Sequence, residues 1–163
     1  MTTTINKQKF ELTEEGLENL KEELHILKNV KRVENLEDIK EARAQGDLSE
    51  NADYDAARNE QAKIEARIKE IEIIIKNAKI IHSASGDSVN IGKEVDLNFL
   101  EKKTKRTLKL VGTIEANPME GRISIESPLG KAIRNHVKGD IVVVHSETKK
   151  SFEVKIEDVR DAK

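Results

Sequence analysis

Apolar residues recur every three or four positions through the first part of the chain, a spacing typical of one face of an α-helix. Between Thr13 and Gly46 they are Leu17, Leu20, Leu24, Leu27, Val30, Val33, Leu36 and Ile39. Thr13 is suited to be the N-cap, and the helix dipole favours the acids Glu14 and Glu15 in the first turn. The pattern predicts one long helix that ends before Gly46.

A second apolar run has a more regular seven-residue repeat. Its positions are Ala57, Gln61, Ile64, Ile68, Ile71, Ile75 and Ala78. In an antiparallel pair of helices, the residue numbers of facing positions add to a nearly constant total. The pairs that meet this condition are Ile39 with Ala57, Val33 with Ile64, Leu27 with Ile71, and Leu20 with Ala78. Residues 1–81 are therefore predicted to form a long antiparallel coiled-coil hairpin that turns within "GDLSE".

The pattern changes after Ile81, where "HSASGDS" has the small and polar residues of a linker. Shorter apolar runs then indicate strands at residues 94–100, 106–111, 122–126, 141–146 and 151–156. The segment "SPLGKAI" predicts a short helix with Ser127 as N-cap and Pro128 in its first turn. Residues 82–163 are thus predicted to form a small α+β domain with a mostly antiparallel sheet.

Composition narrows the functional classes. Charged residues make up 37% of the chain and aromatic residues only 2%, which suits exposed helices joined to one small compact domain. The net charge of −2 excludes bulk electrostatic attraction to nucleic acid or membrane as the driving force for binding. The chain has no cysteine and no run of about 18 apolar residues that would span a membrane. We expect a cytoplasmic protein without membrane contact.

The predicted turn is rich in acids, with Asp47, Glu50, Asp53 and Asp55 close together. One interpretation is local: Asp47 and Glu50 have the spacing of a capping box, and the other two acids favour a helix start. The alternative is that Asp47 and Glu50 bind one Mg²⁺ weakly, since this ion typically takes one or two protein carboxylates and completes its shell with water and phosphate. A long stem would then deliver this pair to a metal site in another protein. The residues alone leave both interpretations open.

The segment "EARAQGDLSENADYDAARNEQ" closely resembles the hairpin tip of the bacterial Gre transcript cleavage factors, most closely the GreA type. "ISIESPLGKAI" followed by "KGDIVVV" resembles the C-terminal domain of the same transcription elongation factors. The resemblance covers nearly the whole chain, with the motifs in the same order.

The resemblance implies an accessory factor and not a free-standing enzyme. Gre factors bind bacterial RNA polymerase, insert the coiled coil into its secondary channel and stimulate the polymerase's own hydrolysis of backtracked RNA 3′ ends. On this resemblance, Asp47 and Glu50 are the catalytic carboxylates, and they help to hold a Mg²⁺ that is shared with the polymerase active site. The free protein would bind this ion weakly or not at all. Arg43 and Arg58 would bind the RNA 3′ segment, although ordinary stem ion pairs are the alternative.

Further residues have implied roles in the same scheme. Ser49 and Asn51 would support the tip, either through the waters of the metal or by shaping the turn. The C-terminal domain would have an FKBP-like fold and dock on the polymerase rim through Ser127 and Pro128. Residues 101–106, "EKKTKR", are interpreted as a solvated loop between strands, with contact to polymerase or RNA as the alternative. The expected partners are the polymerase and the nascent RNA 3′ end, with DNA or RNA contacted only through the elongation complex, and the factor itself is expected to be a monomer.

Two other functions fit a helical hairpin. A Gre-like homologue could block the polymerase channel without promoting cleavage, but such relatives have altered acidic tips, whereas "GDLSEN" is intact here. A scaffold or chaperone-like hairpin could use its apolar seam to bind partner helices. The matched numbering of the two runs indicates instead that each seam is satisfied by the other.

Overall fold

The computed structural model describes residues 9–46, 51–82 and 85–162. The described residues form two compact units. The first covers Leu17–Asn77, and the second combines Lys9–Gly16 with the chain from Ala78 onward. The sequence pattern had suggested a single division between residues 81 and 82. Part of the N-terminal segment joins the second unit because it contributes a strand there.

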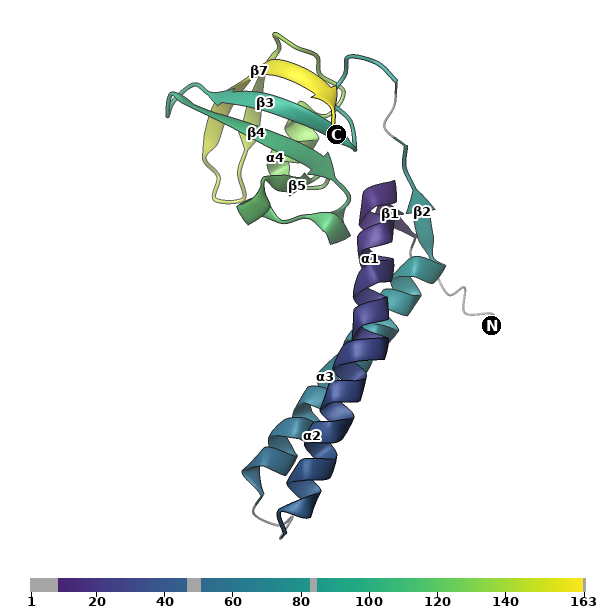
Figure 1. The fold of residues 1–163 in the computed structure, drawn as a ribbon. Coiled ribbons are helices and arrows are strands. Elements are labelled where there is room, and N and C mark those ends of the chain that lie inside the picture. Colours follow the sequence, from purple (N-terminus) through teal and green to yellow (C-terminus); the bar gives the residue numbers. More distant parts are fainter. Residues whose placement is uncertain (1–8, 47–50, 83–84, 163) are drawn as a thin grey trace, which may run out of the picture. The chain divides into compact units, whose positions relative to one another are not determined.

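The first unit is a hairpin of two helical arms (Figure 1). The first arm runs from α1 (Glu14–Ile26) through a π-helical turn (Leu27–Lys31) into α2 (Arg32–Ala44), and the second arm is α3 (Ala52–Lys76). Thr13 is the N-cap of α1, since its Oγ1 accepts a hydrogen bond from the Gly16 N–H at 3.0 Å. None of the described helices is long and apolar enough to cross a membrane.

The seam of the first arm differs from the prediction in its middle. Val30, Val33 and Leu36 are exposed, with Val33 at 52%, so the predicted pairing of Val33 with Ile64 is wrong. From Leu24 to Val33 the apolar residues follow one another at intervals of three, which is less than the roughly 3.6 residues of a helical turn. After three such intervals, Val33 lies about 180° around a regular helix from Leu24. The π-helical turn at Leu27–Lys31 also changes which residues of the first arm face the second arm, because it adds a residue to one turn of the helix.

The observed seam is narrow and apolar on both arms. Its buried residues are Leu20, Ile39 and Ala42 on the first arm and Ala57, Ile64, Ile68, Ile71 and Ile74 on the second. A single polar side chain is buried among the described helical residues, that of Asn35, whose Nδ2 donates to the Ala57 carbonyl at 2.9 Å. Ala78, predicted to end the second seam opposite Leu20, lies beyond α3 in a strand.

Ion pairs line both edges of this seam. Arg67 donates from Nε and Nη2 to the two carboxylate oxygens of Glu23, at 2.7 and 2.9 Å. Arg32 makes the same two-point contact with Glu65, which lowers the pKa of that carboxyl from its ordinary value. The arms are therefore joined by charged contacts at the surface as well as by the seam.

The second unit is built on a five-stranded sheet with the order β5-β4-β3-β7-β6. Its strands are β3 (Lys93–Phe99), β4 (Thr104–Val111), β5 (Arg122–Ser124), β6 (Ile141–His145) and β7 (Ser151–Asp161). β4 and β5 are parallel and every other adjacent pair is antiparallel, which confirms the predicted α+β class with a mostly antiparallel sheet. β7 runs five residues past the predicted end at residue 156, with a register shift opposite Asp96 and Leu97.

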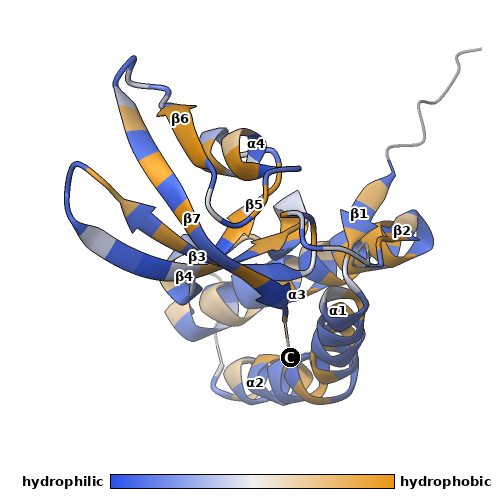
Figure 2. Ribbon diagram, turned by 90° about the horizontal axis from the view of Figure 1, so that it is seen from above, coloured by the Kyte–Doolittle hydropathy of each residue, from blue (hydrophilic) through white to orange (hydrophobic). Residues whose placement is uncertain are grey.

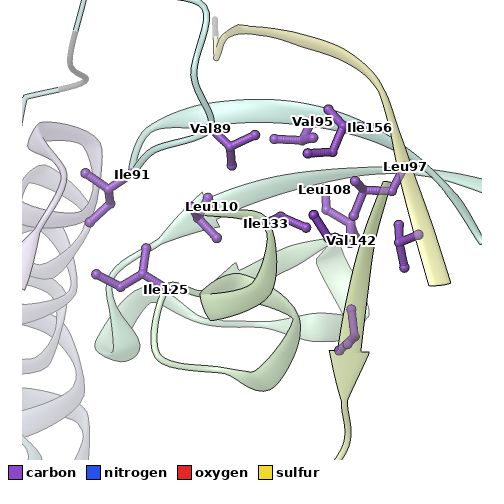
Figure 3. Close-up of a cluster of buried hydrophobic side chains, with 12 residues drawn as sticks. Val89, Ile91, Val95, Leu97, Leu108, Leu110, Ile125, Ile133, Val142 and Ile156 are labelled. Carbon is purple, nitrogen blue, oxygen red and sulfur yellow. The ribbon is translucent and has the colours of Figure 1, made fainter. Parts of the chain in front are cut away.

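One face of this sheet carries the hydrophobic core (Figure 3). The short helix α4 (Pro128–Ile133) covers it, as Figure 2 shows, and Ile133 of that helix is fully buried. The buried cluster consists of Val89, Ile91, Val95, Leu97, Leu108, Leu110, Ile125, Ile133, Val142, Val144, Val154 and Ile156. Buried positions alternate with more accessible ones along β3 and β6, as expected for a sheet with one dry face.

A small parallel pair of strands completes the second unit. β1 (Phe10–Leu12) pairs with β2 (Ala78–Ile80), and Leu12 is fully buried. Next to it, the carboxylate of Glu115 accepts from the backbone N–H and the hydroxyl of Thr13, at 2.8 and 2.5 Å. This pair was missed in the sequence because three-residue strands show too few alternations to be recognised.

Candidate functional site

The connection between the hairpin arms consists of residues 45–51. α2 ends with Gln45 as its C-cap, and Gly46 has φ +116°, a left-handed conformation that a glycine adopts without strain. The glycine therefore ends the first arm as predicted. Asp47, Ser49 and Glu50, to which the resemblance assigns the chemistry, lie outside the described residues.

Asn51 organises the start of the second arm. Its Oδ1 accepts from the Tyr54 N–H at 3.0 Å, and its Nδ2 donates to the Ala42 carbonyl at 2.7 Å. Asn51 is thus the N-cap of α3, and the interpretation of Asp47 as that cap is wrong. Because both polar atoms of its side chain have protein partners, Asn51 shapes the turn, which is one of the two roles predicted for it.

The two exposed acids that follow, Asp53 and Asp55, lie in the first turn of α3. The helix dipole stabilises negative charge at this end. Their placement fits the local interpretation that the sequence suggested for them. It does not extend to Asp47 and Glu50, which precede the helix.

Arg43 and Arg58 lie one on each arm beside the connection, and both are exposed. The guanidinium carbon of Arg43 is 5.8 Å from the centre of the Tyr54 ring, a cation–π distance. Arg58 donates from Nη1 to the Gln61 side-chain oxygen at 2.6 Å. Neither arginine forms an ion pair with a carboxylate of the described residues, so the stem ion-pair alternative finds no support there.

The predicted docking loop belongs to the second unit and is tightly held. The Ser127 hydroxyl accepts from the Gly130 N–H at 3.0 Å and donates to the Ser124 carbonyl at 2.7 Å, and Pro128 occupies the first turn of α4. A Cβ on Gly130 would lie 2.1 Å from the Ser124 carbonyl oxygen, so only glycine fits there. Ser127 and Pro128 are half-buried, whereas the neighbouring Glu126 is exposed. These contacts give the loop a fixed shape.

Within the described part of the chain, no group of three or more His, Cys, Asp or Glu side chains is arranged to hold a metal ion. The oxygen donors proposed for Mg²⁺ are those of Asp47 and Glu50. Their chemistry fits the ion, since carboxylate oxygen is its preferred protein ligand. Two carboxylates leave most of the octahedral shell to other ligands, which suits an ion shared with another protein.

Family comparisons cover both units. A family model described as "Transcription elongation factor, N-terminal" matches residues 10–80. A second, described as "Transcription elongation factor, GreA/GreB, C-term", matches residues 84–161. Together they span nearly the whole chain, in the order that the sequence resemblance predicted.

Two sequence relatives agree with this assignment. "Transcription elongation factor GreA" of Acholeplasma laidlawii is 60% identical over 152 residues, covering 93% of this chain and 96% of the relative. The protein of the same name from Mesoplasma florum is 51% identical, covering 82% of this chain and 86% of the relative. A crystal structure of GreA factor homolog 1 (Gfh1) from Thermus thermophilus is 27% identical and covers 94% of this chain and 99% of that chain, with a TM-score of 0.43. On the family matches and the close relatives, the chain belongs to the GreA/GreB family of transcription elongation factors and is of the GreA type.

Proposed function

We propose that this elongation factor binds bacterial RNA polymerase, places the connection between its helical arms in the secondary channel, and stimulates hydrolysis of backtracked RNA 3′ ends. The polymerase would carry out the reaction, and the factor would supply side chains to it. Arrested complexes would then resume elongation from a new 3′ end. The expected cytoplasmic location follows from this partner.

The intact acidic segment carries the proposal. "GDLSENADY" retains the two carboxylates that the resemblance assigns to the reaction, Asp47 and Glu50. Asn51 already caps α3, so these two acids are not needed for that purpose. A stem of two long helices whose connection contains this pair in the sequence fits delivery of the two carboxylates to another protein's active centre.

The metal would contribute one part of the chemistry. A second Mg²⁺ bound in the polymerase active centre would lower the pKa of an attacking water and stabilise the charge that develops in phosphodiester hydrolysis. Asp47 and Glu50 would provide two of its oxygen ligands and bring negative charge that draws the cation into place. Arg43 and Arg58, which have no described carboxylate partner, would attract the phosphates of the displaced RNA segment.

The second unit would supply affinity for the polymerase. The Ser127–Pro128 loop is rigid because of the Ser127 cap and the close packing of Gly130. A preorganised loop loses little conformational entropy on binding. This division of labour predicts that changes at Asp47 affect cleavage without affecting polymerase binding.

Asp47→Asn is the most direct test. We expect polymerase binding to persist and stimulated cleavage in stalled elongation complexes to fall at least about a hundredfold, since a metal ligand loses its charge. Asp53→Asn is the matched control: it removes the same charge from the nearby first turn of α3 and should leave cleavage nearly unchanged. Full cleavage with Asp47→Asn would refute the metal role. Inhibited elongation without cleavage by the unmodified protein would show instead that the factor blocks the channel.

A further inference from the structure

Two turns of the sheet domain lie at the same end of the sheet (Figure 2). One joins β3 to β4 and the other joins β6 to β7, and the register places both where β3 and β6 end and β4 and β7 begin. The Leu100 N–H donates to the Glu153 carbonyl at 3.2 Å and links the two corners. Residues 99–106 and 146–153 together define what we call the paired-turn surface.

The paired-turn surface is basic in a chain that is acidic as a whole. Six cations lie on it: Lys102, Lys103, Lys105, Arg106, Lys149 and Lys150. All six are exposed, and none forms an ion pair with a described carboxylate. Three acids on the same surface, Glu101, Glu147 and Glu153, leave an excess of positive charge. Such an excess attracts a polyanion over a short range.

Both turns contain a lysine in an unfavourable backbone conformation. Lys103 has φ +49° and Lys149 has φ +61°, in the left-handed region where glycine and asparagine are preferred. Asparagine or glycine at either position would relieve conformational strain. A lysine occupies a strained backbone position in each of two separate turns. This indicates that the positive charge of these lysines serves a purpose beyond folding.

An aromatic cavity opens between the turns. It measures about 610 Å³, and its lining includes Phe99 and Phe152 together with Lys102 and Lys150. The two rings lie at the end of the core face, with centroids 6.0 Å apart and an angle of 30° between their planes. Ser146, Thr148 and Ser151 contribute hydroxyl groups to the same lining. Half-buried aromatic faces beside unpaired cations are the features that bind unpaired bases together with their phosphates.

We propose that the paired-turn surface binds single-stranded RNA. A base would stack on the phenylalanine rings, and the lysines of both turns would contact the flanking phosphates. The hydroxyl groups can hydrogen-bond a ribose 2′-OH, which favours RNA over DNA. The carboxylates of Glu101 and Glu153 can accept hydrogen bonds from the amino group of a base. This site is separate from Asp47, Glu50 and the stem arginines, and goes beyond the function proposed above.

The test measures anisotropy of a fluorescein-labelled RNA of about ten nucleotides, within the usual site size, with the full-length protein over a range of salt concentrations. The main variant is Lys103→Asn/Lys149→Asn, which removes two charges and relieves strain. We expect the slope of log K against log salt to become shallower by about 1.4, as for two lost phosphate contacts on a single strand. Its unfolding temperature should stay the same or rise. A purely structural role for the two lysines predicts no change in the slope.

Three further measurements make the result decisive. Lys131→Asn/Lys138→Asn removes the same charge from other exposed positions of the same unit and should leave the slope unchanged. Phe152→Leu should weaken binding about tenfold with an unaltered slope, because it removes stacking and no charge. Asp47→Asn should bind this RNA normally, so failure of the proposed cleavage role and failure of this proposal are distinguishable.

Several outcomes would overturn the proposal. These are an unchanged slope in Lys103→Asn/Lys149→Asn, an equal change in Lys131→Asn/Lys138→Asn, or equally tight binding of DNA of the same sequence. Loss of polymerase binding with RNA binding intact in Lys103→Asn/Lys149→Asn would show instead that the surface docks protein.

Discussion

The helical hairpin and the sheet domain are stabilised by different kinds of interaction. The sheet domain buries a cluster of twelve apolar residues between its sheet and α4. The hairpin has eight buried apolar residues in its described helices, supported by ion pairs such as Arg67–Glu23 at the edges of the seam. Exposed ion pairs contribute little and are screened by salt, whereas burial of apolar area is not. The comparison indicates that the sheet domain contributes most of the free energy of unfolding. The hairpin has length at the expense of a large core.

Truncating one buried isoleucine side chain in each region tests this comparison. We expect these substitutions to have the largest effect on the free energy of unfolding. Ile156 of the sheet core and Ile68 of the seam are both almost fully buried, at 0% and 2% exposure. We expect Ile156→Ala to lower the free energy of unfolding by about 4 kcal/mol and Ile68→Ala by about 2 kcal/mol, because two helices can close partly on the gap. Urea unfolding gives the two values, and hydrogen exchange assigns each loss to its unit. An equal or larger loss from Ile68→Ala would contradict the comparison.

Substitutions of Asn35 test whether this buried side chain sets the register in which the two arms pair. We expect their effect on stability to be of intermediate size. Asn35→Ala should cost about 1–2 kcal/mol, because the hydrogen bond to the Ala57 carbonyl and the packing of the amide are lost. Asn35→Leu should instead raise the unfolding temperature while it weakens the preference for one register or one oligomeric state, as seen for buried polar residues in coiled coils. Thermal unfolding and sedimentation velocity check the two parts. A less stable but still monomeric Asn35→Leu protein would show that Asn35 does not act as a register device.

Acid should lower the stability of the sheet domain through the surface hydrogen bonds of Asp96 with Arg160 and Thr107. We expect this to be the smallest of the three effects on stability. Hydrogen bonds from Arg160 and then Thr107 lower the pKa of Asp96 from its ordinary value. Its contribution is therefore fully present above the unfolded pKa of about 3.9 and is lost as pH falls through the lower folded pKa. We expect Asp96→Asn to cost less than about 1 kcal/mol near neutral pH, since the network is solvent-screened.

The pH profile separates this effect from general acid denaturation. The unmodified protein should lose stability more steeply below about pH 4 than Asp96→Asn does. Asp87→Asn, at an exposed loop position, provides the control and should follow the unmodified protein. Parallel profiles for Asp96→Asn and the unmodified protein would contradict the role of the network.

Much of the fold was predictable where a long pattern repeats. The regular repeat from Ala57 to Ile71 fixed the second arm, and the Ser127–Pro128 cap marked the start of α4. The first arm was predicted correctly as a helix, but its seam was not, because successive steps of three leave the face and a π-helical turn is not visible in apolar spacing. The β1–β2 pair depends on a contact between distant segments, which local pattern cannot reveal.

The candidate sites were predictable to different degrees. The acidic segment was found from its charge density and its resemblance to a known tip, and the role of Asn51 required the hydrogen bonds seen in the structure. The first half of the paired-turn surface, residues 101–106, was interpreted in the sequence as a solvated loop, with contact to polymerase or RNA as the less favoured alternative. Its second half lies more than forty residues later, and only the register of β3, β6 and β7 brings the two together. The signal that could have found it is lysine at turn positions where glycine or asparagine is usual.

The two hydrogen bonds of Asn51 have a consequence for how the connection could be altered. They clamp the last turn of one arm to the first turn of the other, so residues 45–50 form a loop whose ends are held at a set separation. Lengthening a loop between fixed ends adds only a small entropic cost. An insertion between Gly46 and Asn51 would therefore lengthen the segment that contains Asp47 and Glu50 while the two arms stay paired.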